Sequence, residues 1–359
     1  MTTGTMDRLA FARAAYDSVP LYDPKRSPVD LDLTDNTNLW GMPPTAERVL
    51  REMPVASITR YPSLYAGDLK AEIASYLGNG VTPDMIVTGC GSDDIIDLAM
   101  RAFCEPGHRV AGPEPTFQMI PIFAKMNALE WAGVVELPSH QPDIDALIAT
   151  NPRILYLCSP NNPTGTLVAR EIVERAVAET SGLVFIDEAY AEFAGVSSVD
   201  LVASSNRLLV IRTLSKAYGL AGLRVGYGVG NPALVMEVEK SRGPYKLNAF
   251  AERAAIAALR HDQGWVDEHA ALAVANRERL AGELRSLGVE TLPSHANFLC
   301  APVANCVAVG QALRARGVAV RPFPELPGIG DALRISVGPW PLMERLLEAL
   351  EPALREVNG

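Results

Sequence analysis

The sequence predicts an α/β protein with a large domain, built on a mostly parallel sheet covered by helices, and a smaller α+β domain. Short apolar runs such as Ile154–Cys158, Leu183–Asp187 and Leu208–Ile211 alternate with helical patterns, which is typical of parallel strands buried on both faces. From about Lys246 the pattern changes to long helices followed by separate short strands. A chain of 359 residues also exceeds the usual size of a single core, so two domains are expected.

The elements follow from apolar spacing, with helices where apolar residues recur every three or four positions and strands where short apolar runs lie between turns. We expect an N-terminal arm over 1–30, with a helix over 6–19 that packs on the small domain or a partner subunit, a large domain over 31–245 and a small domain over 246–359. Further strands are predicted at Val29–Leu33, Met85–Thr88, Arg109–Ala111, Asn297–Cys300 and Leu333–Val337. Further helices are predicted at Asp68–Leu77, Thr116–Asn127, Ala169–Glu179, Asn248–Arg260, Val266–Leu287 and Met343–Leu354.

Composition excludes several classes of function. The net charge of −10 argues against nucleic acid as the main partner. The five cysteines are odd in number and widely spaced, and the five histidines lack metal-ligand spacing, so we expect reduced thiols and no metal. Neither a signal-peptide core nor an apolar run long enough to span a membrane is seen, so the expected location is the cytoplasm.

One lysine, Lys216, lies between hydroxyl groups and close to an arginine, directly after a predicted strand. Burial and cationic neighbours can deprotonate such a lysine, which then attacks an aldehyde. Thr213, Ser215 and Arg224 suggest an anion beside it. Pyridoxal 5'-phosphate (PLP) has both an aldehyde and a phosphate, so this stretch could hold both ends of that cofactor. The alternative is a solvated basic loop.

A glycine turn joins a predicted strand to a helix at Gly89–Asp94. Glycine allows close backbone approach, and the free amides of a helix start favour a phosphate. Gly91, Ser92 and Asp93 are therefore candidates for an anion site. Alternatively, the acidic residues only cap the helix.

Four other residues are candidates for the same site. Asp187 ends a buried strand, where a carboxylate needs a cation such as a protonated pyridine, or else caps the next helix. Asn162 has donors for a phenolate oxygen, although Asn-Pro-Thr-Gly is also a good turn. Phe117 could stack on a ring or fill the core. Arg334 lies in an apolar strand and so requires a carboxylate partner.

Together these residues resemble the aspartate aminotransferase superfamily, which has PLP-dependent transferase fold type I, and most closely its histidinol-phosphate aminotransferase branch. The likeness runs from about Leu31 to the C-terminus. It rests on four motifs in order: Ser159-Pro-Asn-Asn-Pro-Thr-Gly165, Ile186-Asp-Glu-Ala-Tyr190, Arg212-Thr-Leu-Ser-Lys-Ala-Tyr-Gly-Leu-Ala-Gly-Leu-Arg224 and Leu333-Arg-Ile-Ser-Val-Gly338.

The resemblance implies a PLP-dependent aminotransferase of histidine biosynthesis that moves an amino group between histidinol phosphate and 2-oxoglutarate. Lys216 would carry the internal aldimine and shuttle the proton, Asp187 would protonate the pyridine nitrogen, and Asn162 and Tyr190 would bind the 3-oxygen. Phe117 would cover the ring, and the phosphate would meet Gly91, Ser92, Asp93, Thr213, Ser215, Arg224 and, from the other subunit of a homodimer with shared sites, Tyr61. The substrate would meet Tyr22, Asn36, Arg321 and Arg334.

Two departures from the branch bear on the substrate. Thr37 stands where the branch has a carboxylate, and Lys246 where a small polar residue or asparagine is expected, so the mouth of the site should be more positive. Three alternatives therefore stay open: an aromatic or broad-range aminotransferase, a PLP-dependent decarboxylase of the threonine-phosphate type, and a binding protein without chemistry. The last is disfavoured because both Lys216 and Asp187 are present.

Overall fold

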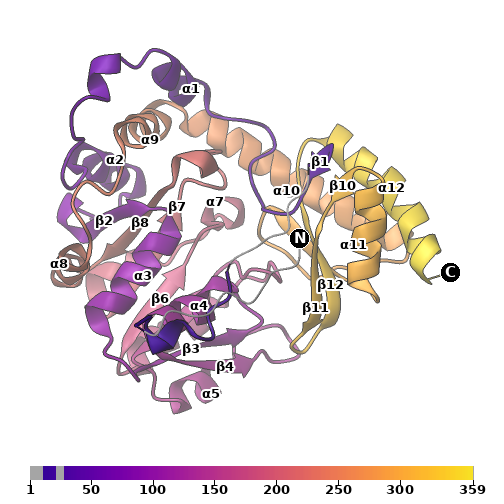
Figure 1. The fold of residues 1–359 in the computed structure, drawn as a ribbon, viewed down its shortest axis with the longest axis horizontal. Coiled ribbons are helices and arrows are strands. Elements are labelled where there is room, and N and C mark those ends of the chain that lie inside the picture. Colours follow the sequence, from indigo (N-terminus) through magenta and orange to yellow (C-terminus); the bar gives the residue numbers. More distant parts are fainter. Residues whose placement is uncertain (1–10, 22–27, 359) are drawn as a thin grey trace.

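The large sheet dominates the computed structural model, which describes residues 11–21 and 28–358 (Figure 1). Within these residues seven strands form one sheet in the order β2-β8-β7-β6-β5-β3-β4. Their bounds are β2 Ile86–Cys90, β3 Arg109–Glu114, β4 Glu130–Val135, β5 Ile154–Cys158, β6 Leu183–Asp187, β7 Leu208–Thr213 and β8 Val225–Gly230. All pairings in it are parallel except those of β8 with β2 and β7, so the predicted α/β class is confirmed.

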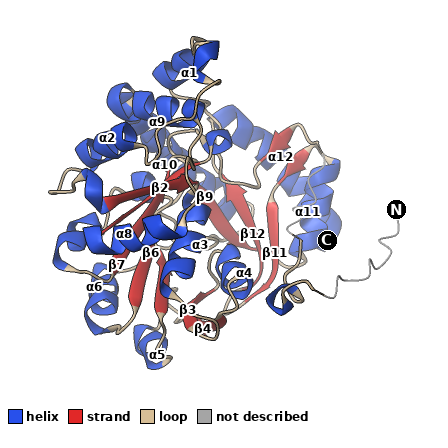
Figure 2. Ribbon diagram, turned by 60° about the vertical axis from the view of Figure 1, so that its left-hand side comes forward, coloured by secondary structure: helices blue, strands red, loops and turns tan. Residues whose placement is uncertain are grey.

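Helices cover both faces of this sheet (Figure 2). On one face, Tyr156 and Phe185 pack with α3 Ser92–Phe103, α4 Met119–Met126 and α8 Pro232–Ser241. On the other, Leu155 and Ile186 share a core with α2 Gly67–Leu77, α5 Ile144–Ala149, α6 Arg170–Glu179 and α9 Ala249–His261. α1 Pro44–Arg51 and α7 Ala191–Ala194 complete the helices of this part. The strands are thus buried on both sides, which explains their continuous apolar sequences.

Strand β8 was not predicted from the sequence because its glycines are unfavourable for an isolated strand. The packing requires them. A Cβ atom on Gly226 would lie 2.2 Å from the backbone of Gly91 and Ser92. The antiparallel strand can therefore lie directly against the turn before α3, at the edge where the candidate residues gather.

A second core lies beside the large sheet. Strands β9 Phe298–Pro302, β11 Arg321–Leu326 and β12 Gly330–Ser336 form an antiparallel sheet, and β1 Leu31–Asp32 pairs with β10 Val318–Ala319. α11 Cys306–Ala315, α12 Trp340–Asn358 and the C-terminal half of α10 Gln263–Ser286 cover these strands. The long helix α10 connects the two parts (Figure 1).

Residues near the predicted boundaries at 31 and 246 contribute to both cores. Leu31 and Leu33 belong to the second core, whereas Ala254 of α9 and Val266 of α10 belong to the core of the large sheet. The boundaries over 31–245 and 246–359 remain predictions.

The N-terminal helix predicted over 6–19 is not formed in its described part. Within residues 11–21 the structure has one short 3₁₀ turn, Ala14–Tyr16, and residues 6–10 lie outside the described range. Phe11 and Leu21 are exposed and none of residues 11–21 is fully buried, so little tertiary packing supports a helix in this segment. Separately, none of the helices in the described ranges is long and apolar enough to cross a bilayer.

Candidate active site

The candidate residues gather around one cavity of about 520 Å³ at the carboxyl ends of the parallel strands, where open α/β sheets bind ligands. Its lining includes most of the residues predicted from the sequence: Asn36, Ser92, Asp93, Phe117, Asn162, Asp187, Tyr190, Thr213, Ser215, Lys216, Arg224, Arg321 and Arg334. They come from both parts of the chain, so the cavity lies between the large sheet and strands β11 and β12.

Lys216 follows β7 and points across the cavity. Its Nζ donates a hydrogen bond to the carbonyl oxygen of Asp35 at 2.9 Å and lies 5.8 Å from the ring centre of Tyr190. Burial, together with the positive charge of Arg334, lowers the pKa of Lys216 to about 8. A substantial fraction of this amine is therefore neutral near physiological pH, which is the form that attacks carbonyl carbons.

Asp187 ends β6 at the floor of the cavity and is buried. Its carboxylate accepts hydrogen bonds from Tyr156 Oη at 2.8 Å and from the Ala189 amide at 3.1 Å. Among the described residues, no cation forms an ion pair with it. Burial therefore raises the pKa of Asp187 to about 6, although both hydrogen bonds oppose the shift. The site thus contains a buried carboxylate that a cationic ligand would stabilise.

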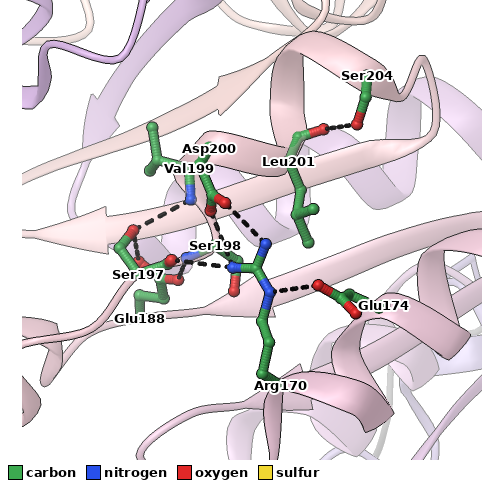
Figure 3. Close-up of polar contacts among 9 residues, drawn as sticks. All are labelled: Arg170, Glu174, Glu188, Ser197, Ser198, Val199, Asp200, Leu201 and Ser204. Atoms are coloured by element: carbon green, nitrogen blue, oxygen red, sulfur yellow. Dashed lines mark hydrogen bonds and ion pairs between the residues drawn. The ribbon is translucent and has the colours of Figure 1, made fainter.

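The residue after Asp187 anchors the end of β6. Glu188 accepts hydrogen bonds from Ser197 Oγ at 2.7 Å and from the Ser198 amide at 2.5 Å (Figure 3). It also forms a buried ion pair with Arg212 of β7 at 3.0 Å. In the same view, Arg170 of α6 binds Asp200 and Glu174. These contacts hold the loop that follows the strand.

A cationic cradle forms where α3 begins. Arg224, which has a left-handed φ of 55°, lies 3.4 Å from Ser215 Oγ and 3.8 Å from the carboxylate of Asp93. Thr213 Oγ1 donates to Ser215 Oγ at 2.8 Å. Gly91 has a φ of 87°, which favours glycine, and a Cβ atom there would lie 2.3 Å from the Arg224 guanidinium. Hydroxyls, a guanidinium and the amides of a helix start together form a set suited to a phosphate.

Arg334 of β12 closes the opposite side. Its guanidinium donates to Asn162 Oδ1 at 2.6 Å and to the Thr34 carbonyl. Both of these partners are neutral oxygens, and the carboxylate partner expected for Arg334 stays a prediction. Tyr190 Oη accepts a hydrogen bond from Asn36 Nδ2 at 3.1 Å, and Ser336 Oγ binds Asn36 in turn. This network joins the small sheet to the cavity wall.

A second arginine lies next to Arg334. Arg321 on β11 is its cross-strand partner, and the Phe323 ring lies 5.9 Å from Arg321 and 5.5 Å from Arg334. Two guanidinium groups thus face one region of the cavity. Phe117 is half-buried on the large-sheet side of the same cavity.

The profile of the family described as aminotransferase class I and II matches residues 28–350. The chain belongs to this family. It is similar to a histidinol-phosphate aminotransferase of Thermoanaerobacter pseudethanolicus, with 35% identity over 93% of this chain and 95% of that protein. Another of Roseiflexus castenholzii is 39% identical over 89% of each chain. The crystal structure of a Sinorhizobium meliloti histidinol-phosphate aminotransferase with pyridoxal-5'-phosphate shares the fold, with a TM-score of 0.88, 24% identity and coverage of 98% and 100%.

Aminotransferases of this family use PLP, and the cavity of this chain fits that cofactor. The buried Asp187 suits a protonated pyridine nitrogen, and the cradle around Arg224 suits a phosphate. Lys216, with its lowered pKa, suits an aldehyde carbon. The chain is therefore an aminotransferase similar to the histidinol-phosphate enzymes, as the sequence motifs predicted.

Two predicted features are not at the cavity within one chain, and a third falls outside the described residues. The Tyr61 side chain is 81% exposed and stacks on Tyr245 with ring centres 4.6 Å apart. Tyr22 lies outside the described residues. Lys246 does not add a free cation to the mouth, as the sequence had suggested, because its Nζ pairs with Asp94 at 2.9 Å.

Several residues of the site were not found from the sequence. Tyr156 binds Asp187, Cys158 and Thr116 line the cavity, and Phe323 separates the two arginines. A periodicity argument could have found Tyr156, since it lies two residues before the end of β5 and its strand pairs with that of Asp187. Cys158 is buried, which raises the pKa of its thiol well above the ordinary value. It is therefore a protonated wall residue rather than a nucleophile.

Proposed function

We propose that this aminotransferase transfers an amino group from a donor with an anionic tail, histidinol phosphate foremost, to 2-oxoglutarate. Arg321 and Arg334 at opposing positions of β11 and β12 carry the proposal. Two adjacent guanidiniums match a donor with a phosphate and an acceptor with two carboxylates, because arginine binds both groups through paired hydrogen bonds. The histidinol-phosphate aminotransferases that this chain resembles support the same choice.

Each residue has a defined task in this proposal. When bound, PLP supplies an aldehyde for amino groups and an aromatic ring that accepts electrons. Lys216 would hold the aldehyde end of the cofactor through Nζ and would carry the proton at the substrate α-carbon. Asp187 keeps a proton on the ring nitrogen, and its own position is held by Tyr156. Asn162 and Tyr190 bind the ring oxygen, while Asn162 also orients Arg334.

The cradle residues hold the phosphate in this proposal. Arg224 supplies the charge, the start of α3 supplies amides, and Ser215 and Thr213 supply hydroxyls. Arg334 binds the carboxylate of the acceptor, and its neighbour Arg321 binds the second anionic group. Asn36, which contacts Tyr190, lies beside the bound substrate. Phe117 covers the ring face.

We further propose a homodimer in which Tyr61 completes the partner's phosphate site. The segment between α1 and α2 lies at the periphery of the chain (Figure 1). It exposes several large apolar side chains: Val55, Ile58, Tyr61, Leu64 and Tyr65. Such an exposed group is typical of a subunit interface. The cytoplasmic location also remains a proposal, consistent with five cysteines that form no disulfide.

Spectroscopy of the purified protein tests the proposed chemistry. The protein is loaded with PLP, reduced with borohydride and digested, and the labelled peptide is expected to contain Lys216. A panel of amino donors is then added to unreduced enzyme while the cofactor absorbance is followed. Histidinol phosphate should convert the cofactor to its amino form and 2-oxoglutarate should reverse the change. A label on another lysine such as Lys125 or Lys240 would overturn the assignment, and release of carbon dioxide would indicate a decarboxylase.

A further inference from the structure

An ion pair lies behind the phosphate cradle and links it to a distant segment. Lys246, in the segment between α8 and α9, places its Nζ 2.9 Å from Asp94 Oδ1 in the first turn of α3. The two side chains are 25% and 14% exposed, so the pair is largely shielded from water. A shielded pair is stronger than one on the surface.

The other oxygen of Asp94 fastens the turn before α3. Asp94 Oδ2 accepts a hydrogen bond from the Cys90 amide at 2.9 Å. The carboxylate lies close against Gly89, where a Cβ atom would be 2.7 Å from Asp94 Oδ2. One carboxylate therefore connects Lys246 to the backbone of the glycine turn.

The opposite side of this turn touches the cradle itself. A Cβ atom on Gly91 would lie 2.3 Å from the Arg224 guanidinium. A Cβ atom on Gly226 of β8 would lie 2.2 Å from the backbone of Gly91 and Ser92. The turn is thus held between Asp94 on one side and Arg224 with β8 on the other. A shift of Asp94 would displace the first amides of α3.

The charge of Lys246 acts on this same turn. Asp93 and Asp94 both lie in the first turn of α3, where they oppose an anion that the helix start would otherwise attract. The cation of Lys246 neutralises Asp94, and Arg224 lies 3.8 Å from Asp93. Each acid in this turn therefore has a cationic neighbour.

We propose that Lys246 is a positioning residue for the phosphate end of the cofactor and acts by neutralising the charge of Asp94 in the turn that would face the phosphate. The proposal rests on the proposed binding of PLP in this cavity. It predicts an effect on phosphate recognition in particular, without contact between Lys246 and the reacting atoms.

Equilibrium dialysis of the full-length protein against PLP and against pyridoxal, which lacks the phosphate, tests this role. Lys246→Met should raise the Kd for PLP about 5-fold, because a shielded charge near a dianion is lost. The Kd for pyridoxal should stay unchanged, and Lys246→Arg should restore PLP binding. Asp94→Asn keeps an oxygen for the Cys90 amide and removes a negative charge, so it should not weaken PLP binding. Lys240→Met, which breaks the exposed pair with Glu237, is the matched control.

Equal weakening of PLP and pyridoxal binding by Lys246→Met would overturn the proposal, as would weaker PLP binding in Asp94→Asn. Either result would assign the pair a general structural role. If Lys246→Met does not fold, Lys246→Arg and Asp94→Asn still decide, since a loss of PLP affinity in both contradicts the proposed role. Failure of the wild-type protein to bind either compound would instead refute the proposed PLP site.

Discussion

Replacing Asp187 by asparagine should stabilise the protein without cofactor and cripple the enzyme with it. The carboxylate is buried beside Tyr156 and has no ion pair among the described residues, so burial raises its pKa from 3.8 to about 6. A raised pKa means that the folded state holds the proton more tightly than the unfolded state. Stability is therefore lost as the pH rises from about 4 to 6, and at neutral pH the loss amounts to about 3 kcal/mol.

Urea titrations of the apoprotein at pH 5 and pH 8 measure this effect. Asp187→Asn should be more stable than the wild type by up to about 3 kcal/mol at pH 8 and by roughly half as much at pH 5, because asparagine carries no charge to bury. With PLP bound, the variant should be much less active than the wild type. The pyridine nitrogen loses its anionic partner, so turnover should fall by orders of magnitude.

A matched control is available outside the cavity. Asp200→Asn removes a carboxylate whose pKa is lowered by its hydrogen bonds with Arg170, so it should lower stability slightly and leave turnover unchanged. Near-normal turnover in Asp187→Asn would show that Asp187 only caps the strand end. An apoprotein that is less stable than the wild type at pH 8 would refute the electrostatic reasoning.

Three further predictions concern other residues. Burial raises the pKa of Glu136 to about 8 and its Oε2 has no partner among the described residues, so the wild type should lose up to about 1.4 kcal/mol of stability per pH unit between about pH 4.5 and pH 8. Glu136→Gln should abolish this loss in urea titrations, and the same dependence of stability on pH in the variant would contradict the reasoning. Lys216→Ala should still bind PLP by dialysis but lose almost all turnover at every pH, whereas activity that returns at high pH would point to another base. Mixing inactive Tyr61→Ala with inactive Lys216→Ala should restore part of the activity through heterodimers with one intact site; no recovery despite confirmed subunit exchange would exclude a shared site.

The sequence predicted the central strands well because their chemistry is local. Strands β5 and β6 agree with the predicted bounds, since each is an apolar run between turns and is buried on both faces. Strand β8 was missed because its glycines serve contacts with Gly91 and Ser92 that no local pattern reveals. Strand β11 contains Pro322 and Pro324, which argue against a strand except at an edge, and β11 is an edge strand.

Some residues of the site could likewise be found from the sequence, and others only from the fold. Lys216, Asp187 and Arg224 could be found because each breaks a local rule or belongs to a recognisable motif. The contacts of Phe323 and Asp94 could not be found in this way, because these residues come from other strands and helices. Lys246 shows the limit most clearly. Its charge was visible in the sequence, but its pairing with Asp94, 152 residues away, exists only in the fold.

The choice of amino donor is tested most directly by kcat/KM for histidinol phosphate, phenylalanine, tyrosine and glutamate in wild type and Arg321→Ala. Arg316→Ala, which breaks the surface pair with Glu356, serves as the control. Wild type should prefer histidinol phosphate, and Arg321→Ala should lower its kcat/KM by about 30-fold or more, because a charge-assisted contact in a shielded site contributes roughly 2 to 5 kcal/mol. The aromatic donors should change little. A wild type that prefers the aromatic donors, with Arg321→Ala affecting all donors alike, would contradict the phosphate-tail assignment and indicate an aromatic or broad-range aminotransferase.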